Sequence, residues 1–116
     1  MDSRFRAPMT LEEYQRAAAR TVNPRLSDTE RLVDAAAGLA EEAGEVLGLV
    51  RKHAYMGHEL DRDRLTRELG DVLWCVATIA SGLGVTLDEV AAANVEKLRG
   101  RYPDGYSDEA SRSRPD

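Results

Sequence analysis

The chain has 116 residues, enough for one domain with a modest core. Its 21 acidic residues outnumber its 16 basic ones, and the formal net charge of -5 argues against a broad basic face that binds duplex DNA. The longest apolar run, VLWCVATIA at residues 72–80, is far shorter than the roughly 20 residues needed to cross a bilayer. Neither a nucleic-acid polymer nor a membrane is therefore expected among the partners.

The number of cysteines and the first residues of the chain both indicate the cellular compartment. Cys75 is the only cysteine, so no internal disulfide can form. The first ten residues, MDSRFRAPMT, lack the apolar segment of a secretory signal. Both features favour a reducing environment, and a cytoplasmic location is expected.

Helix starts are marked along the sequence. Three capping boxes, each a Ser or Thr followed three residues later by Glu, predict helices that begin at Thr10, Ser27 and Thr86. Another helix is predicted from about Asp61 to about Leu83, after the turn-forming segment YMGHELD. No segment alternates with the period of two that is typical of a strand. The fold class is therefore predicted to be all-α, with four helices.

The end of the chain has a different composition. The segment after Tyr102, PDGYSDEASRSRPD, is rich in turn-forming and charged residues and has few side chains suited to burial. Residues 1–102 are therefore predicted to form the domain, and residues 103–116 a flexible C-terminal tail.

The segment LAEEAGEVLGLVRK places three carboxylates in the second predicted helix. On a helical wheel, Glu42 lies about 60–80° from the centre of the apolar stripe and Glu45 about 120–140°, on the same side. In the third helix Glu68 and Asp71 lie at nearly the same two offsets from its own stripe. The stripes themselves are Leu32, Ala36, Leu39, Ala43, Val46 and Val50 in the second helix, and Leu65, Leu69, Val72, Val76, Ile79 and Leu83 in the third. Packing through these stripes would gather the four carboxylates around one pocket.

Such a pocket needs positive charge. Four carboxylates at a partly dehydrated site would cost several kcal/mol each if they were left unpaired. Neither stripe supplies matching Lys or Arg residues, whereas hard divalent cations, Mg²⁺ above all, prefer oxygen ligands of this kind. Either motif alone is typical of a solvated helix face, which stays the alternative, but the matched offsets favour a metal site for one or two ions.

The last predicted helix carries cations beside its apolar row. Asn94 interrupts that row, and a core-facing amide requires hydrogen-bond partners. Lys97 and Arg101 lie on the same side as Asn94, where they could bind phosphate oxygens. The alternative is that they complement the dipole at the carboxyl end of their helix.

The carboxylate motifs resemble those of MazG-type nucleotide pyrophosphohydrolases, members of the all-α nucleoside triphosphate pyrophosphatase superfamily. The family pattern is Glu-Glu-x-x-Glu followed by Glu-x-x-Asp, and here it reads EEAGE from Glu41 to Glu45 and ELGD from Glu68 to Asp71. The ending NVEKLRGRYPDGYS is also similar to that of small MazG-like proteins. The resemblance implies a four-helix MazG-like bundle completed by oligomerisation. It also implies Mg²⁺-dependent cleavage of an NTP or dNTP between the α- and β-phosphates, giving NMP or dNMP plus pyrophosphate, with Mn²⁺ as an accepted substitute.

The resemblance also assigns roles to residues. The implied metal ligands are Glu42, Glu45, Glu68 and Asp71, and the implied catalytic proton acceptor is Glu41 or Glu45. The implied substrate-binding residues are Asn94, Lys97, Arg101 and Tyr102. A homodimer or homotetramer is expected, with a second surface formed by Trp74 and by the small residues Ala37, Gly44 and Gly48.

Two rival functions remain at this point. A phosphoribosyl-ATP pyrophosphohydrolase uses a related bundle with similar carboxylates, and a helical module could bind nucleotide without hydrolysing it. A di-iron carboxylate bundle is disfavoured because neither carboxylate pair belongs to a Glu-x-x-His motif. The sequence does not specify the base or the sugar of the substrate.

Overall fold

In the computed structural model of the chain, residues 9–114 are described. Residues 1–8 and 115–116 lie outside the described residues. The expectation that the chain has no secretory signal rests mainly on residues 1–8. The described chain confirms the all-α prediction, with five α-helices and no strand. The helices are α1 (Leu11–Ala19), α2 (Asp28–Tyr55), α3 (Arg62–Gly82), α4 (Leu87–Arg101) and α5 (Asp108–Ser113).

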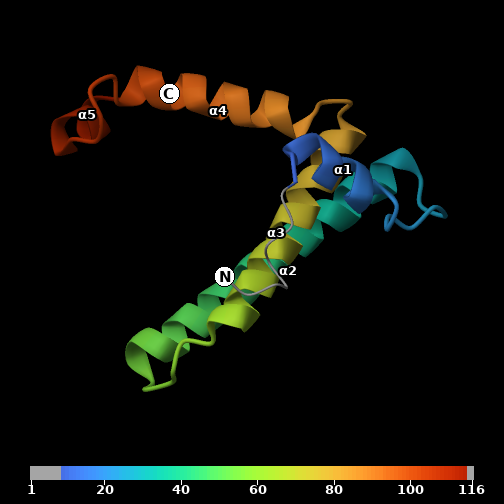
Figure 1. Ribbon diagram of the computed structural model, residues 1–116, viewed down its shortest axis with the longest axis horizontal. Coiled ribbons are helices and arrows are strands. Elements are labelled where there is room, and N and C mark those ends of the chain that lie inside the picture. Colours follow the sequence, from blue (N-terminus) through green and yellow to red (C-terminus); the bar gives the residue numbers. More distant parts are fainter. Residues whose placement is uncertain (1–8, 115–116) are drawn as a thin grey trace.

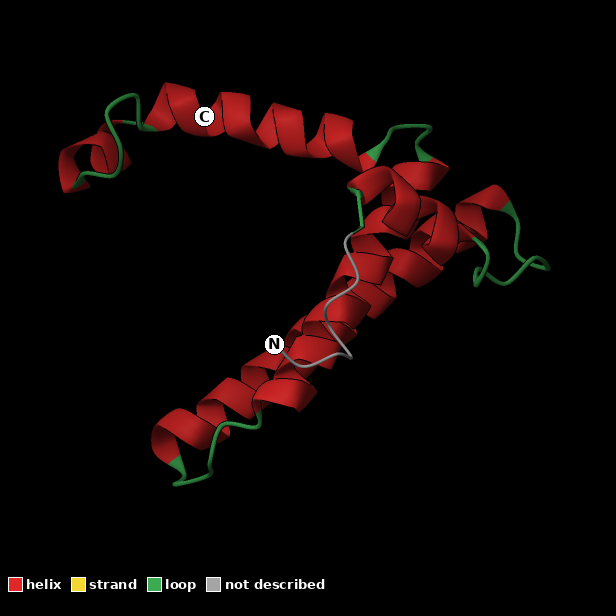
Figure 2. Cartoon of the chain, in the orientation of Figure 1, coloured by secondary structure: helices red, strands yellow, loops and turns green. Residues whose placement is uncertain are grey.

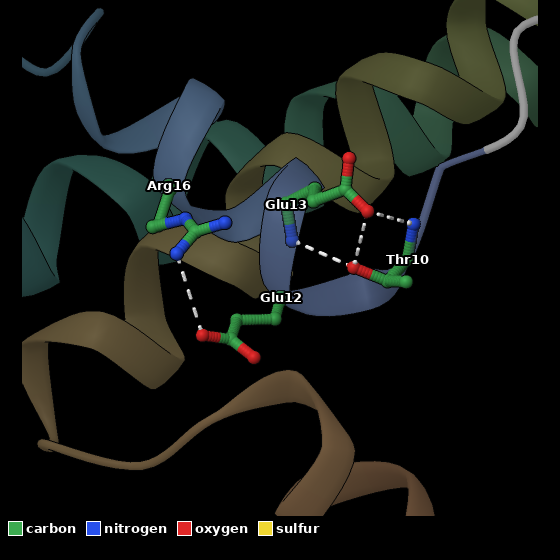
Figure 3. A network of polar contacts seen from close by, with 4 residues as sticks. All are labelled: Thr10, Glu12, Glu13 and Arg16. Atoms are coloured by element: carbon green, nitrogen blue, oxygen red, sulfur yellow. Dashed lines mark hydrogen bonds and ion pairs between the residues drawn. The ribbon is translucent and has the colours of Figure 1, made fainter.

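The three predicted capping boxes are confirmed at the starts of α1, α2 and α4. Figure 3 shows the first box, in which the Thr10 hydroxyl accepts from the Glu13 backbone N–H at 3.1 Å and Glu13 accepts from the Thr10 N–H at 3.4 Å. An exposed ion pair between Arg16 and Glu12 lies beside it at 3.5 Å. Because each box satisfies donors that a helix terminus leaves unpaired, these starts are determined by local sequence.

The helices form a hairpin with an arm. Helices α2 and α3 pack side by side along most of their length, and α1 packs against the C-terminal part of α3 (Figures 1 and 2). Helix α4 is bent by 101° from α3 and leads away from the hairpin, carrying α5 at its far end. The buried core is small and lies where α1, α3 and the first turn of α4 meet, around Ala18, Ala77, Ala80 and Leu87.

The contact between α2 and α3 follows a heptad-like pattern. In each helix, one series of buried and half-buried positions alternates in spacings of four and three residues, as in a coiled-coil seam. They are Ala35, Leu39, Glu42, Val46 and Leu49 in α2, and Leu65, Glu68, Val72, Cys75 and Ile79 in α3. Glu42 and Glu68 therefore occupy positions within the seam.

The predicted stripes were partly wrong. Ala36, Ala43 and Val50 of the α2 stripe are exposed, as are Leu69 and Leu83 of the α3 stripe. The physical reason is that α2 carries alanine on several faces, so that hydrophobicity alone does not fix which face packs. The true seam is rotated toward the carboxylates.

Gln15 joins α1 to two other elements. Its amide Nε2 donates to the Ser81 hydroxyl and to the Val85 carbonyl, both at 3.0 Å, and its Oε1 accepts from the Leu87 N–H at 2.8 Å. The last bond satisfies a backbone donor at the first turn of α4, which has no partner within its own helix. Gln15 therefore helps to fix the angle at which α4 leaves the hairpin.

We expect Gln15→Ala to lower the free energy of unfolding by about 2–3 kcal/mol, because three hydrogen bonds are lost and partly buried backbone groups are left unpaired. Chemical denaturation of the purified variant measures this change. The matched control is Arg16→Ala, which removes only an exposed ion pair and should cost about 0.5 kcal/mol or less. Equal effects of the two substitutions would contradict the structural role of Gln15.

The predicted tail contains a short helix. Ser107 caps α5 by accepting from the Ala110 N–H at 3.0 Å, and the ring centroids of Tyr102 and Tyr106 lie 5.5 Å apart just before it. No residue of α5 is buried. The flexibility of this segment stays a prediction, but its local structure is helical.

Within residues 9–114, no single helix has the length and apolar character to span a membrane. Helices α3 and α4 meet that test only as a pair, and the pair is sharply bent.

Candidate functional site

Three of the predicted metal ligands meet across the α2–α3 seam. Glu42 of α2 and Glu68 and Asp71 of α3 each offer a carboxylate oxygen, and these oxygens all lie within 4.8 Å of one another. Glu42 and Glu68 are half-buried and Asp71 is exposed. The group is therefore open to solvent on the Asp71 side and enclosed by the two helices on the other.

Close helix packing beside the group depends on a small residue. A Cβ atom added to Gly38 would lie 3.2 Å from the Sγ atom of Cys75, closer than the usual van der Waals contact. Gly38 lies one turn before Glu42, and Cys75 one turn after Asp71. The glycine thus lets α2 and α3 approach each other next to the carboxylates, and keeps the carboxylates within reach of one another.

The electrostatics of the group disfavour full ionisation. The pKa of Glu42 is raised, chiefly because its carboxyl shares a hydrogen bond with Glu68, and further because of partial burial and the negative charges of Asp71, Glu68 and Glu41. A carboxyl–carboxylate hydrogen bond needs one proton between the two groups. A divalent cation can replace that proton, so this donor set fits a hard cation such as Mg²⁺.

A cavity of about 310 Å³ is lined by two of the three carboxylates, Glu42 and Asp71. Its walls come from α2 and α3, and they combine acidic side chains with one indole ring and one thiol: Asp34, Ala37, Gly38, Glu41, Glu42, Asp71, Trp74 and Cys75. The pKa of the Cys75 thiol is raised by burial and by these carboxylates, Glu42 first among them. The thiol is therefore held in its neutral form, as expected in so acidic a cavity.

Two aromatic residues, Trp74 of α3 and Tyr14 of α1, link the N-terminal part of the chain to this region. The Trp74 indole Nε1 donates to the Thr21 hydroxyl at 2.7 Å, just beyond the end of α1. Burial raises the pKa of Tyr14, and the charge of Asp71 raises it further, so the Tyr14 phenol stands near the carboxylates. Trp74 is half-buried against the core, and its predicted place on an oligomer surface stays a prediction.

The other predicted acidic residues lie differently. Glu41 lines the cavity with an exposed side chain. Glu45 is exposed and belongs neither to the three-carboxylate group nor to the cavity wall. The predicted four-ligand set is thus gathered only in part, and a ligand role for Glu45 stays a prediction.

The predicted substrate-binding residues lie on the arm. Asn94 and Lys97 are exposed on α4, and Arg101 and Tyr102 are half-buried at its far end. Because α4 leads away from the hairpin (Figure 1), one chain does not bring these side chains to its own carboxylates. Any role for them at the carboxylates requires a second copy of the chain.

Sequence reasoning missed four residues near the carboxylates. Asp34 and Gly38 precede Glu42 by two turns and one turn on the same face of α2, so helical spacing was a usable signal for them. Tyr14 comes from another helix and gives no local signal, because its place depends on how α1 packs. Cys75 was considered only for disulfide formation, although its spacing from Asp71 places it on the same face of α3.

Comparisons with known proteins indicate the family of the chain. The model of the MazG nucleotide pyrophosphohydrolase domain matches residues 32–106, a range that holds all three carboxylates and α4. The chain is 38% identical over 106 residues to the Gene 37 protein of Mycobacterium phage L5, covering 84% of this chain and 92% of that protein. It is 36% identical over 78 residues to the Uncharacterized protein YvdC of Bacillus subtilis (strain 168), covering 55% of this chain and 69% of that protein. No solved structure shows significant similarity to the chain. The family match over most of the chain, together with the all-α fold, shows that this chain belongs to the MazG nucleotide pyrophosphohydrolase family.

Proposed function

We propose that the protein is a Mg²⁺-dependent hydrolase that cleaves a nucleoside triphosphate between the α- and β-phosphates, releasing a monophosphate and pyrophosphate. The observation that carries the proposal is the meeting of Glu42, Glu68 and Asp71 beside a cavity in a chain of this family. Oxygen ligands grouped in this way suit a cation that in turn binds phosphate oxygens.

Glu42, Glu68 and Asp71 would hold the cation. When bound, it neutralises phosphate charge and lowers the pKa of the attacking water. Glu41 lines the cavity and is exposed, so it is placed to accept the proton of that water, and we assign it this role in preference to Glu45. Phosphoryl transfer asks the protein mainly to position groups and to stabilise charge, which these side chains can do without a covalent intermediate.

The carboxylates alone do not supply cations for the leaving pyrophosphate. Helix α4 carries Lys97, Arg99 and Arg101 in its last two turns, but it leads away from the carboxylates of its own chain. We therefore propose that α4 of a second copy lies along the α2–α3 hairpin and brings Lys97 and Arg101 to the cavity. The cations in the last two turns of α4 and the carboxylates of the cavity have opposite charges, which favours this pairing.

The shape and the exposed apolar side chains support a second copy. The radius of gyration is 17.0 Å, against about 13 Å for a compact domain of this length. Only Leu87 of α4 is buried, and Val95 and Leu98 are 44% and 42% exposed on the arm. Leu47 and Leu69 are exposed on the hairpin as well. Apolar side chains exposed on both surfaces would be buried together in a two-fold pair, either alone or as half of a tetramer.

Product analysis tests the proposed reaction. We expect purified protein to convert at least one member of a panel of canonical and modified NTPs and dNTPs to a monophosphate with Mg²⁺, and to do nothing in EDTA. Hydrolysis that persists in EDTA would contradict the assigned role of the carboxylates. Turnover of phosphoribosyl-ATP alone would select the rival enzyme, and nucleotide binding without any product would select the binding module.

A further inference from the structure

The acidic cavity has one aromatic wall, the indole of Trp74. The polar edge of this indole is engaged elsewhere, because its Nε1 donates to the Thr21 hydroxyl at 2.7 Å and Thr21 does not line the cavity. The ring also packs against the buried core that α3 forms with α1. The indole is therefore held in a fixed orientation, and it can offer a ligand in the cavity only its carbon surface.

Small residues line the cavity at the level of the indole. A Cβ atom added to Gly38 would lie 3.2 Å from the Sγ atom of Cys75, so these two residues stand opposite each other in the hairpin. Trp74 adjoins Cys75 in the chain, and the wall that α2 provides at this level consists of Ala37 and Gly38. Because these two residues have almost no side-chain volume, they leave room for a flat ring against the indole.

Asp34 lines the cavity at the opposite end from Glu42. It precedes Glu42 by eight residues of α2, which is about 12 Å along the helix axis. The pKa of the Cys75 thiol is raised first by burial, then by Glu42, and also by the charge of Asp34, so the Asp34 carboxylate lies on the cavity side of its helix. Asp34 makes no hydrogen bond or ion pair with the described part of the chain. Trp74 lies between the two ends, since its neighbour Cys75 stands at the level of Gly38.

These features indicate a ligand with an anionic end and a planar ring. Phosphate oxygens bound through a cation at Glu42 gain nothing from an aromatic wall, whereas a nucleobase stacks on an indole. The Asp34 carboxylate accepts hydrogen bonds and donates none, so it suits the N–H edge of such a base. A nucleotide with its phosphates at Glu42 has about the length needed to reach both Trp74 and Asp34.

Building on the proposed function, we propose that Trp74 stacks the base of the substrate and that Asp34 selects guanine. Guanine presents two N–H donors side by side, N1–H and the 2-amino group, which match the two oxygens of one carboxylate. Adenine and cytosine present an amino group next to a ring acceptor, and uracil and thymine present one N–H between two carbonyl oxygens. With each of these four bases a carboxylate oxygen faces an acceptor, and a site that binds a pair of donors rejects such a base.

Tryptophan fluorescence tests the stacking directly, because Trp74 is the only tryptophan in the chain. We expect the α,β-methylene analogue of GTP, added with Mg²⁺, to quench the emission in a saturable way, since a stacked base quenches an indole. Inorganic tripolyphosphate, which has no base, should compete with the analogue and leave the emission unchanged. N-acetyltryptophanamide in the same solutions controls for light absorbed by the nucleotide. Saturable binding of the analogue by calorimetry without quenching would overturn the stacking role of Trp74.

Calorimetric titration tests the role of Asp34 independently of turnover. The α,β-methylene triphosphate of guanosine should bind about tenfold or more tightly than those of uridine and of inosine, which lacks the 2-amino group. Asp34→Asn should reduce both ratios toward one, because an amide offers one acceptor oxygen in place of two. Asp88→Asn is the matched control, since Asp88 is exposed in the first turn of α4 and does not line the cavity. Equal binding of the three analogues, or an unchanged preference in Asp34→Asn, would overturn the selection of guanine.

Ala37→Leu tests the space beside the indole. Ala37 is exposed and lines the cavity, so a larger side chain there should obstruct the base without disturbing the packing of α2. Binding of the guanosine analogue should weaken and the quenching should be lost, while the affinity for tripolyphosphate stays unchanged. Ala36→Leu is the control, because Ala36 is also exposed but lies outside the cavity walls. Equal effects of the two substitutions would contradict the position assigned to the base.

The outcomes separate this inference from the proposed reaction. Guanine-selective binding with quenching but without hydrolysis would refute the reaction and leave the base subsite standing. Release of monophosphate and pyrophosphate with no base preference and no quenching would overturn the subsite and leave the reaction standing. A change of emission that follows the protein concentration and not the nucleotide would place Trp74 at a contact between copies and would also overturn the subsite. Absence of any nucleotide binding would overturn both.

Discussion

Glu42→Gln is expected to lower kcat/KM for the nucleotide substrate by more than about 100-fold, without lowering the stability of the metal-free protein. Loss of a residue that merely supports a metal ligand already costs 10- to 100-fold, so loss of a ligand should cost more. The amide keeps the size of the side chain, and it removes a carboxyl that crowds Glu68 and Asp71. Steady-state kinetics and thermal unfolding in EDTA measure the two effects.

The pH dependence of stability provides a further check on the same variant. The pKa of Glu42 is raised in the folded protein, so ionisation of Glu42 opposes folding. In wild type, Glu42 therefore contributes to the stability of the fold at pH values below the ordinary pKa of Glu. This contribution is lost as the pH rises through the raised pKa of Glu42. Glu42→Gln should therefore match wild type near pH 4 and be equal or more stable at pH 7, in EDTA. A variant that is less stable at pH 7 would contradict the crowded carboxylate group.

Glu12→Gln is the control for a lost surface carboxylate. Glu12 is exposed on α1 and pairs only with Arg16 among the described residues. Its substitution should leave activity unchanged and alter stability by about 0.5 kcal/mol or less. Asp71→Asn, in contrast, should lose activity as Glu42→Gln does.

Mixing two inactive variants is expected to restore activity. Asp71→Asn removes a proposed metal ligand from the hairpin, and the double variant Lys97→Ala/Arg101→Ala removes the cations from α4. If each site combines the hairpin of one copy with α4 of another, a mixed pair contains one site with neither defect. Random assembly makes half of the pairs mixed, so about a quarter of the wild-type activity should return.

The control mixture combines Asp71→Asn with Glu68→Gln, two defects on the same surface. Every site then carries one of them, and no activity should return. Activity assays after co-refolding, with size-exclusion chromatography to show that mixed species form, complete the test. A fully active monomer, or mixed pairs that stay inactive in the first combination, would rule out α4 acting in a second copy.

Local sequence signals account for most of the secondary structure. The capping boxes at Thr10, Ser27 and Thr86 predicted three helix starts that the structure confirms, because capping involves only residues three apart in the chain. The short helix α5 was missed because a turn-rich composition outweighed the single cap at Ser107. Composition describes a segment on average, whereas one side chain is enough to start a helix.

The packing faces were harder to predict than the helices. The spacing of Glu42, Glu68 and Asp71 was enough to expect them together, and the structure brings them together. Their place within the seam was not expected, because a wheel built on hydrophobicity assigns charged residues to its edge. The contact of Trp74 with Thr21, just beyond the end of α1, was not expected either, because it depends on where α1 packs.

The position of α4 depends on contacts that no periodicity encodes. Gln15 joins α1 to the Leu87 N–H at the start of α4, and the bend after α3 directs the rest of the helix away from the hairpin. The sequence therefore predicted phosphate-binding roles for Lys97 and Arg101 without specifying which copy's carboxylates they would serve.

The most direct test of the central claim is to identify the products formed from a hydrolysed nucleoside triphosphate by ³¹P NMR, with Mg²⁺ present. The proposed reaction predicts monophosphate and pyrophosphate in equal amounts from wild type and neither product from Asp71→Asn. Orthophosphate and a nucleoside diphosphate as the first products, or equal turnover by Asp71→Asn, would contradict cleavage between the α- and β-phosphates at this carboxylate site.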